Sequence, residues 1–437
     1  MKHIDRQILQ IALPSIVSNI TVPLLGLIDV AIVGHLGSPA YIGALAVGGM
    51  LFNIIYWIFG FLRMGTSGMT SQAYGKRDLP EIVRLLMRSV GIGLAVALCL
   101  ILLQVPIRQA AFLIIHPTAD VREMATLYFH ICIWGAPAML GLYGLSGWFI
   151  GMQNSRIPMY IAITQNIVNI IASLSFVCFF KMKVEGVAFG TLIAQYAGFI
   201  MGLVLWMSRY GKLKKYILWK GVLQKEAMMR FFQVNRDIFL RTLCLVTVTL
   251  FFTSAGASQG EIILAVNTLL MQLFTLFSYV MDGFAYAGEA LSGRYIGARN
   301  RKAFTNTTRH LFIWGGWLAA FFTLVYALGG NAFLGLLTDN KDVVSAAGTY
   351  FYWALAIPVA GIAAFIWDGI FIGATATRGM LASMAIAAIS FFVVYYGLRP
   401  VLGNHALWLA FLVYLAMRGV VQTLLSPKII KENFTQP

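Results

Sequence analysis

Twelve long apolar runs limit what this chain can fold into more than any other feature of its sequence. A helix that crosses the hydrocarbon core of a bilayer needs about 20 consecutive, mainly apolar residues. We therefore predict an all-α polytopic membrane protein with about twelve transmembrane helices. The runs fall at about 8–34, 42–70, 88–108, 123–150, 157–180, 185–207, 237–256, 260–292, 310–330, 345–373, 380–398 and 404–425.

Composition excludes an ordinary soluble protein. The chain has 437 residues, of which 59% are hydrophobic and only 11% are charged, whereas soluble domains carry roughly 25% charged residues. The net charge of +16 would suit nucleic-acid binding in a soluble protein. Because the basic residues lie between apolar runs, we interpret them as loop charges and expect no nucleic-acid partner.

Basic residues are distributed unevenly among the connections. Most follow an even-numbered run, above all in 76–88, 208–236 and 294–309. The odd-numbered connections hold only Arg108, Arg122, Lys181, Lys183, Lys341 and Arg399. Basic loops tend to stay on the cytoplasmic side of a membrane, so we expect the even connections and both termini to be cytoplasmic. We expect the protein to lie in the cell's inner membrane and to cross it many times. We also expect it to be a monomer.

The longest polar segment divides the chain near its middle. We expect an N-terminal six-helix lobe over 1–207, a basic cytoplasmic linker over 208–236 and a C-terminal six-helix lobe over 237–437. Apolar residues such as Trp219 and Leu223 alternate with basic ones in the linker. That pattern fits either a short amphipathic helix on the cytoplasmic leaflet or a plain connection.

The two halves resemble each other at a constant separation of 222 residues along the chain, which we call the repeat offset. The stretch 75–78 (Gly-Lys-Arg-Asp) matches 297–300 (Gly-Ala-Arg-Asn), and 147–151 (Gly-Trp-Phe-Ile-Gly) matches 369–373 (Gly-Ile-Phe-Ile-Gly). Because each half has an even number of runs, the halves share one orientation, related by a pseudo-two-fold axis along the membrane normal. Alternating-access transporters use such repeats, although a purely structural duplication would give the same pattern. We predict a secondary transporter.

Asp29 stands out among the few ionisable residues inside the runs. A charge at bilayer depth costs at least about 2.5–3.5 kcal/mol, and no basic residue lies within a helical turn or two of Asp29. An apolar environment disfavours the charged form of a carboxyl group, which can then take up and release a proton near neutral pH. We favour a coupling-ion site here over a carboxyl group that only packs against a neighbouring helix.

A polar face in the fifth run is the second candidate for this site. Asn166, Asn169 and Ser173 follow one another at i, i+3 and i+7, which places them on one side of a helix. Such side chains often form hydrogen bonds between helices. The alternative is that they face the same cavity as Asp29.

Other charges inside the runs suit structural or gating roles. Asp237 and Arg241 are four residues apart at the start of the seventh run, and this spacing suits an ion pair on one helical face. Arg63 in the second run is a further basic residue that could pair with an acid on another helix.

Acidic residues of the second half are candidates for a substrate cavity. Asp282 and Glu289 share one face of the eighth run beside Tyr279 and Tyr286, and Asp368 lies in the tenth run. Acids and aromatic rings together could attract cations, or the acids could pair with arginines, and the sequence leaves both interpretations open. The equivalent positions of the first half carry no charge.

Four prolines fall within the runs, at Pro14, Pro23, Pro137 and Pro358. Proline lacks a backbone N–H and clashes with the preceding turn, so it kinks helices and frees carbonyl groups. We expect kinks at these positions.

The sequence does not predict an enzyme or an ATP-driven pump. The six histidines are scattered without metal-ligand spacing, and no Gly-Lys-Ser/Thr phosphate-binding loop is present. We expect no cofactor and no metal, with H+ or Na+ as the coupling ion.

Several stretches together resemble the multidrug and toxic compound extrusion (MATE) family, in particular its DinF-like branch. They are 27–37, 61–66, 235–242, 282–289 and 367–375, and the Asp-Gly-Phe-Ala-Tyr-Ala motif that starts at Asp282 is fairly specific. The resemblance implies two six-helix lobes in a V shape. It also implies antiport of H+ or Na+ against organic, often cationic, compounds.

The same resemblance implies that Asp29 is a coupling residue. Related members have an asparagine in the fifth helix and an aspartate four residues later, whereas this chain has Asn169 and Ser173. Without the second carboxylate, H+ is favoured over Na+. Two alternatives remain: a flippase for lipid-linked precursors or polysaccharides, and a non-transporting membrane scaffold or receptor.

Overall fold

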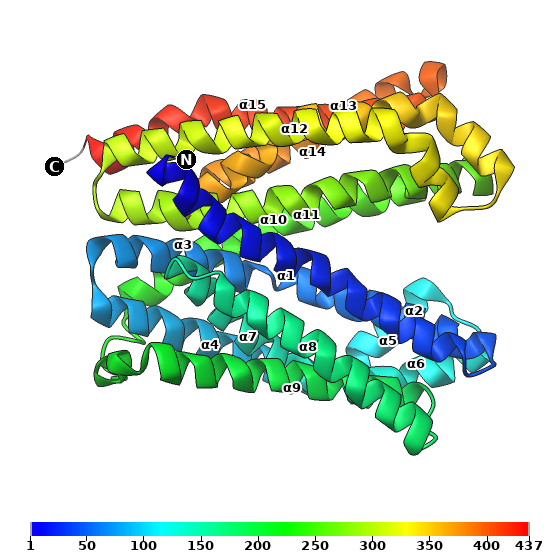
Figure 1. Cartoon of the computed structure of the whole chain (residues 1–437), viewed down its shortest axis with the longest axis horizontal. Coiled ribbons are helices and arrows are strands. Elements are labelled where there is room, and N and C mark those ends of the chain that lie inside the picture. Colours follow the sequence, from blue (N-terminus) through cyan, green and yellow to red (C-terminus); the bar gives the residue numbers. More distant parts are fainter. Residues whose placement is uncertain (1, 436–437) are drawn as a thin grey trace. The chain divides into compact units, whose positions relative to one another are not determined.

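The computed structural model describes residues 2–435, and helices make up nearly all of this part of the chain (Figure 1). In chain order they are α1 (His3–Gly34), α2 (Pro39–Ile58), α3 (Phe61–Lys76), α4 (Leu79–Leu102), α5 (Gln104–Ile115), α6 (Ala119–Cys132), η1 (Ile133–Gly135), α7 (Ala136–Gly151), α8 (Arg156–Leu174), η2 (Ser175–Phe179), α9 (Val184–Arg209), η3 (Gly211–Tyr216), α10 (Lys225–Ala257), α11 (Glu261–Gly297), α12 (Arg301–Leu337), α13 (Lys341–Gly373), α14 (Thr377–Leu402) and α15 (Asn404–Phe434).

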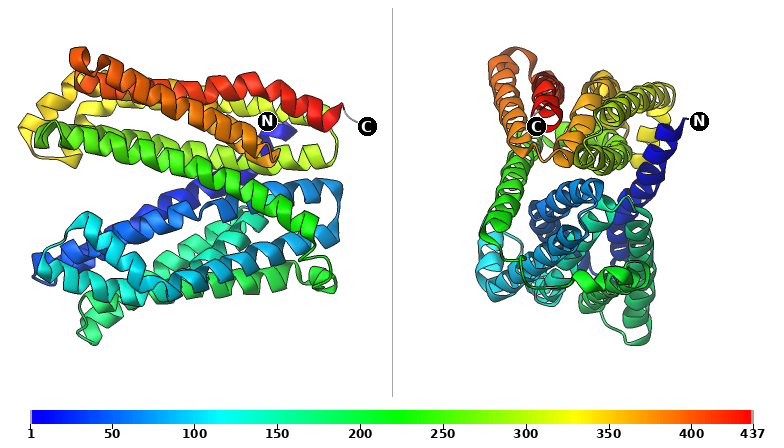
Figure 2. Two further views of the ribbon diagram at one scale, coloured as in Figure 1. Left: turned by 180° about the vertical axis from the view of Figure 1, so that it is seen from behind. Right: turned by 90° about the vertical axis from the view of Figure 1, so that its left-hand side faces the viewer.

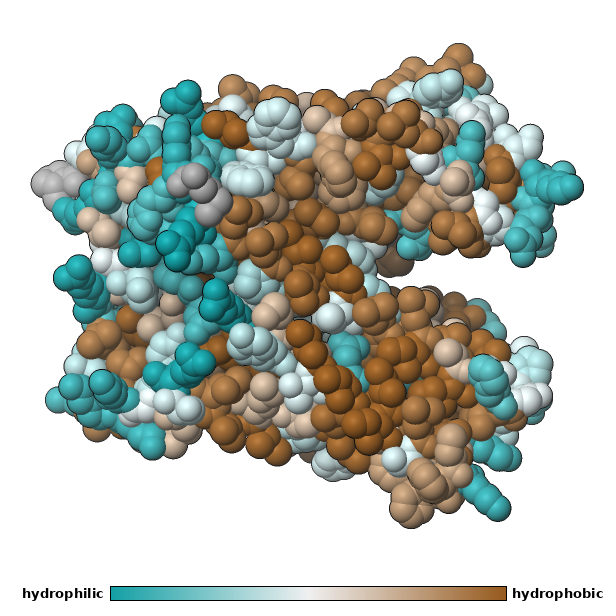
Figure 3. Space-filling view, viewed as in Figure 1, coloured by the Kyte–Doolittle hydropathy of each residue, from teal (hydrophilic) through white to brown (hydrophobic). Residues whose placement is uncertain are grey.

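Twelve helical stretches in this part of the chain are long and apolar enough to span a membrane, which confirms the predicted number. Three spans combine adjacent helices: α2 with α3, α6 and η1 with α7, and α8 with the short π-helical turn η2. Apolar residues cover the sides of the helices, and hydrophilic ones gather toward the helix ends (Figure 3). One short apolar helix, α5, was not predicted as a separate element.

The predicted linker 208–236 differs from the structure in its second part. A short 3₁₀-helix, η3, follows α9, and irregular backbone then leads to Lys225, where α10 begins. The last residues of the predicted linker are therefore the first turns of the seventh spanning helix. A separate amphipathic α-helix is not formed within 208–224.

The repeat is visible in the helix bounds. The span α6–α7 and its counterpart α13 begin and end one repeat offset apart, and so do the starts of α1 and α10. The left-handed turn residues repeat as well, because Arg77 and Arg299 have φ of 59° and 54°, and Gln153 and Thr375 have φ of 67° and 52°. Such conformations are uncommon outside glycine, so their recurrence confirms a structural duplication.

Matching glycines bring the same helices into close contact in both halves. A Cβ atom on Gly147 of α7 would lie 2.3 Å from the carbonyl oxygen of Arg63 on α3. A Cβ atom on Gly369 of α13 would lie 2.2 Å from the carbonyl oxygen of Ala285 on α11. Both members of the second pair follow those of the first by the repeat offset. Small residues permit this backbone contact between spanning helices.

The chain forms two compact units. One, the N-lobe, comprises Val17–Asn235, and the other, the C-lobe, combines the residues up to Ile16 with those from Arg236 onward. The first turns of α1 therefore belong to the C-lobe, and those of α10 to the N-lobe, which differs from the simple division predicted at 207 and 237. Within the lobes, α8 packs along α9 and α14 along α15 (Figure 2).

Candidate functional site

Asp29 lies inside the N-lobe, with only 5% of its surface exposed. Its Oδ1 atom accepts a hydrogen bond from Asn169 Nδ2 on α8 at 3.3 Å, and its Oδ2 atom accepts one from Thr191 Oγ1 on α9 at 3.3 Å. Asp29 itself is on α1, so the site joins three helices. Within the described residues, Asp29 forms no ion pair, and neutral groups alone hold its carboxyl group.

Ser173 fixes the orientation of Asn169. Its hydroxyl group donates to Asn169 Oδ1 at 2.8 Å, so the Asn169 amide directs its NH2 group at Asp29. Gly190 on α9 makes room for Ser173, because a Cβ atom there would lie 2.1 Å from Ser173 Oγ. We refer to Asp29, Asn169, Ser173 and Thr191 as the Asp29 cluster.

The structure brings together most, but not all, of the predicted coupling residues. Asn169 and Ser173 belong to the Asp29 cluster, but Asn166 does not: its Nδ2 atom donates to the Ala162 carbonyl group at 3.0 Å. Among the residues that the structure describes, its buried Oδ1 atom has no hydrogen-bond partner. Thr191 was not predicted, although it is one of few polar side chains in the sixth apolar run.

Aromatic side chains flank the Asp29 cluster. Tyr128 and Cys132 on α6 lie within electrostatic range of the Asp29 carboxyl group, and both are buried. Phe52 on α2 contacts Tyr128 and Phe129, with ring centroids 6.2 Å and 5.2 Å apart.

A different polar cluster occupies the C-lobe. Asp368 on α13 accepts hydrogen bonds from Arg241 on α10 at 2.5 Å, from Arg418 on α15, and from Gln422 on α15 at 2.6 Å. Asp368, Arg241 and Arg418 are each less than one-tenth exposed. Of the two interpretations left open for Asp368, the pairing with arginines is the one observed. These four residues form the Asp368 cluster.

The predicted ion pair between Asp237 and Arg241 is wrong. Asp237 accepts hydrogen bonds from Arg236 at 3.1 Å and from the Thr377 hydroxyl group at 2.9 Å, whereas Arg241 reaches Asp368. Arg241 therefore pairs with Asp368 on another helix, where Arg418 and Gln422 complete the contacts of the same carboxylate. The Asp237 carboxylate is held by Arg236 and Thr377 instead.

Arg418 and Gln422 were not singled out from the sequence. Both lie within the apolar run 404–425, four residues apart, so the signal was present. An arginine within a spanning helix indicates a buried acidic partner on another helix, and here that partner is Asp368.

The remaining predicted residues are placed as follows. Glu289 is buried on α11, where this helix packs against α13, and Asp282 lies within electrostatic range of Arg418. Tyr279, Tyr286 and Arg63 are partly buried.

Of the four prolines, only Pro137 lies at a break in a helix, just after the 3₁₀ turn η1. The helices α1 and α13 continue without interruption through Pro14, Pro23 and Pro358.

The repeat shows that each cluster belongs to one lobe alone. The positions of the second half that correspond to Asp29, Asn169 and Ser173 carry Phe251, Phe391 and Tyr395. The ring of Phe251 contacts those of Phe391 and Tyr395, with centroids 5.8 Å and 5.3 Å apart. The same contact is thus polar in the N-lobe and aromatic in the C-lobe. In turn, the N-lobe has neutral residues (Asn19, Ser146 and Tyr196) where the C-lobe has Arg241, Asp368 and Arg418.

Over residues 2–435, two six-helix repeats, twelve spanning helices and a buried carboxyl group without a counter-charge define a polytopic membrane transporter. Comparison with known proteins identifies its family. The MatE family model matches residues 14–174 and again 238–398, one copy in each half, so the chain belongs to the MatE family. It is a transporter and not an enzyme.

Known relatives agree with this assignment. The chain is 39% identical over 420 residues to DNA damage-inducible protein F of Escherichia coli, covering 95% of this chain and 90% of that protein. It is 21% identical over 421 residues to the probable multidrug resistance protein NorM of Synechococcus, covering 92% and 88%.

Solved structures show the same fold. A MATE protein in its bent conformation matches with a TM-score of 0.90 over 100% of this chain and 98% of that one, at 18% identity. The Vibrio cholerae MATE transporter VcmN in its bent form matches with a TM-score of 0.87 over 98% of each chain, at 17% identity.

Proposed function

We propose that this chain is an H+-coupled antiporter that exports organic, cationic or amphipathic compounds by alternating access, with Asp29 as the proton-binding residue. One observation carries the proposal: Asp29 is buried between three helices and held only by the neutral groups of Asn169 and Thr191. The relatives' printed names, which include a probable multidrug resistance protein, support export of foreign compounds.

Burial without a counter-charge links the protonation of Asp29 to the state of the N-lobe. A charged carboxylate is expensive away from water unless it is paired, and protonation removes that cost. Entry of water into the lobe stabilises the charged form, which releases the proton. When the access of water to Asp29 changes, the affinity of its carboxyl group for a proton therefore changes as well.

The geometry of Asn169 favours a proton over a metal cation. The amide directs N–H groups at Asp29, and its oxygen accepts from Ser173. A cation such as Na+ needs oxygen atoms pointing inward, as hard cations do in proteins. We propose H+ coupling on this ground.

Asp368 in the C-lobe is a poor second carrier. Two buried guanidinium groups hold its carboxylate, which favours the charged form. We propose that the Asp368 cluster fixes α10, α13 and α15 together and that coupling depends on the N-lobe alone. We also propose that the protein is a monomer of the inner membrane with cytoplasmic termini, as the loop charges indicate.

Efflux of a fluorescent organic cation from cells or vesicles tests the function. With a proton gradient imposed in the opposite direction to export, the wild type should export the cation with or without Na+, whereas Asp29→Asn should not. Asp339→Asn is the matched control, since it makes the same chemical change at an exposed position. Strict dependence on Na+ would exclude H+ coupling, and equal efflux by wild type and Asp29→Asn would exclude Asp29.

A further inference from the structure

The segment between α9 and α10 is held firmly against the N-lobe. Arg88 on α4 is only 3% exposed, and its side chain donates to the carbonyl groups of Val222 at 2.8 Å and Gly221 at 2.9 Å. The same guanidinium group pairs with Glu81 at 2.8 Å. Val222 is itself buried. A buried arginine thus anchors the middle of a chain connection.

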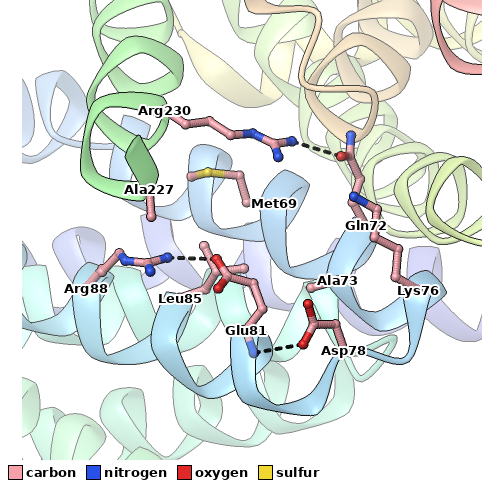
Figure 4. A pocket seen from close by; sticks show the side chains of 10 residues that line it. All are labelled: Met69, Gln72, Ala73, Lys76, Asp78, Glu81, Leu85, Arg88, Ala227 and Arg230. Atoms are coloured by element: carbon pink, nitrogen blue, oxygen red, sulfur yellow. Dashed lines mark hydrogen bonds and ion pairs between the residues drawn. The ribbon is translucent and has the colours of Figure 1, made fainter. Parts of the chain in front are cut away.

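Further anchors lie on both sides of this point. Tyr210 packs edge-on against the buried Trp148, with ring centroids 4.9 Å apart, and its hydroxyl group accepts from Asn154 at 3.2 Å. After the connection, Arg230 on α10 donates to Gln72 on α3 at 3.1 Å. Figure 4 shows Arg88 and Arg230 lining one pocket from α4 and α10.

Between the anchors, large apolar side chains point away from the protein. Leu218, Trp219 and Leu223 are 62%, 75% and 73% exposed. The hydrogen bonds from Arg88 to Gly221 and Val222 hold the backbone between these side chains against the N-lobe. A cluster of exposed apolar side chains of this kind indicates a surface that interacts with a membrane or another molecule.

The same segment is strongly basic. From 211 to 226 it contains the single acid Glu226 and five lysines, namely Lys212, Lys214, Lys215, Lys220 and Lys225. The three exposed apolar side chains lie among these lysines. Lysine ammonium groups around tryptophan and leucine are typical of segments that bind the surface of an anionic membrane.

We propose that residues 211–225 form a binding surface for anionic phospholipids. Leu218, Trp219 and Leu223 enter the headgroup region of the leaflet, and the lysines bind lipid phosphates. The segment connects the ends of two spanning helices, α9 and α10, which keeps it at the depth of the headgroups. Since it is anchored to the N-lobe by Arg88, the bound lipid holds this end of the N-lobe at the membrane surface.

Quenching of Trp219 fluorescence by brominated lipids tests the proposal in nanodiscs. The Trp219 signal is the difference between wild type and Trp219→Phe, measured with brominated phosphatidylglycerol or brominated phosphatidylcholine at equal mole fractions. We expect the anionic lipid to quench at least about twofold more strongly. The preference should disappear in the triple variant Lys212→Gln, Lys214→Gln, Lys220→Gln.

A second triple variant controls for net charge. Lys302→Gln, Lys428→Gln, Lys431→Gln removes the same charge from exposed residues at other helix ends, and it should keep the preference. Equal quenching by both lipids, no quenching by either, or equal loss in both triple variants would overturn the proposal. Because the readout needs no transport, the result is independent of the proposed function.

Discussion

Asp29 and Phe251 occupy equivalent positions in the two halves of the chain, yet they make opposite kinds of contact. Asp29 is hydrogen-bonded to Asn169, whereas Phe251 packs against Phe391, the residue equivalent to Asn169. The duplicated backbone therefore provides one pair of helix positions that is polar in one lobe and apolar in the other. This contrast supports our proposal that the proton-binding step lies in the N-lobe.

Thr191 should be needed for transport. Thr191→Val keeps the shape of the side chain but leaves Asp29 Oδ2 without its donor, and an unsatisfied buried group costs about 1–3 kcal/mol. We expect efflux to fall about fivefold or more at normal expression. Thr268→Val is the control, because the Thr268 hydroxyl group is exposed and bonds only to its own helix. Equal efflux by Thr191→Val and the control would argue against a role for Thr191.

Gly190 should tolerate no side chain. A Cβ atom there would lie 2.1 Å from Ser173 Oγ and 2.9 Å from the Ser173 backbone nitrogen, and overpacking of this kind costs about 1–3 kcal/mol. Gly190→Ala should therefore lower the melting temperature in detergent. Gly91→Ala, where nothing lies within 4 Å of the added Cβ atom, should not. An unchanged melting temperature in both variants would show that α8 and α9 can separate freely here.

Replacement by asparagine should affect the stability of the protein differently at the two buried aspartates. Asp368→Asn leaves Arg241 and Arg418 without their carboxylate, and breaking a buried pair costs about 3–5 kcal/mol. Asp29→Asn removes a carboxyl group that has no counter-charge, so stability should stay the same or rise. Thermal unfolding in detergent measures both.

A double variant tests the reason for this difference. Asp368→Asn combined with Arg418→Gln removes one charge of each sign and should recover part of the stability that Asp368→Asn loses. If Asp29→Asn were the more damaging substitution, the assignment of the two clusters would be reversed.

Arg88 should protect the segment between α9 and α10 from proteolysis. Arg88→Gln removes donors to Gly221 and Val222, so trypsin should cleave at the lysines from Lys212 to Lys225 faster than in the wild type. Arg301→Gln is the control, since Arg301 is exposed at the start of α12. Similar cleavage rates in both variants would mean that Arg88 does not anchor this segment.

The sequence predicted the spans and the repeat well because both depend on local patterns. Runs of apolar residues set the helices, and glycines such as Gly147 and Gly369 recur because the backbone of another helix lies against them. Asn169 and Ser173 were found because one helical face carried them both. These features are visible in a single segment of sequence.

The partners of the buried charges depend on which helices meet, and local spacing does not report that. Asp237 and Arg241 have the spacing of an ion pair, but Arg241 binds Asp368, 127 positions away. Thr191 looked like one polar residue in an apolar run until α8 and α9 placed it beside Asp29. Tertiary contacts decided these cases, and helical periodicity could not.

Proton movement in proteoliposomes without Na+ tests the central claim most directly. With an internal pH-sensitive dye, addition of an exported organic cation should produce a proton flux in wild-type vesicles, opposite in direction to the cation. Asp29→Asn vesicles should show none, while Asp339→Asn vesicles should match the wild type. A substrate-dependent proton flux that persists in Asp29→Asn, or wild-type transport that occurs only with Na+, would contradict the role of Asp29 as the proton-binding residue.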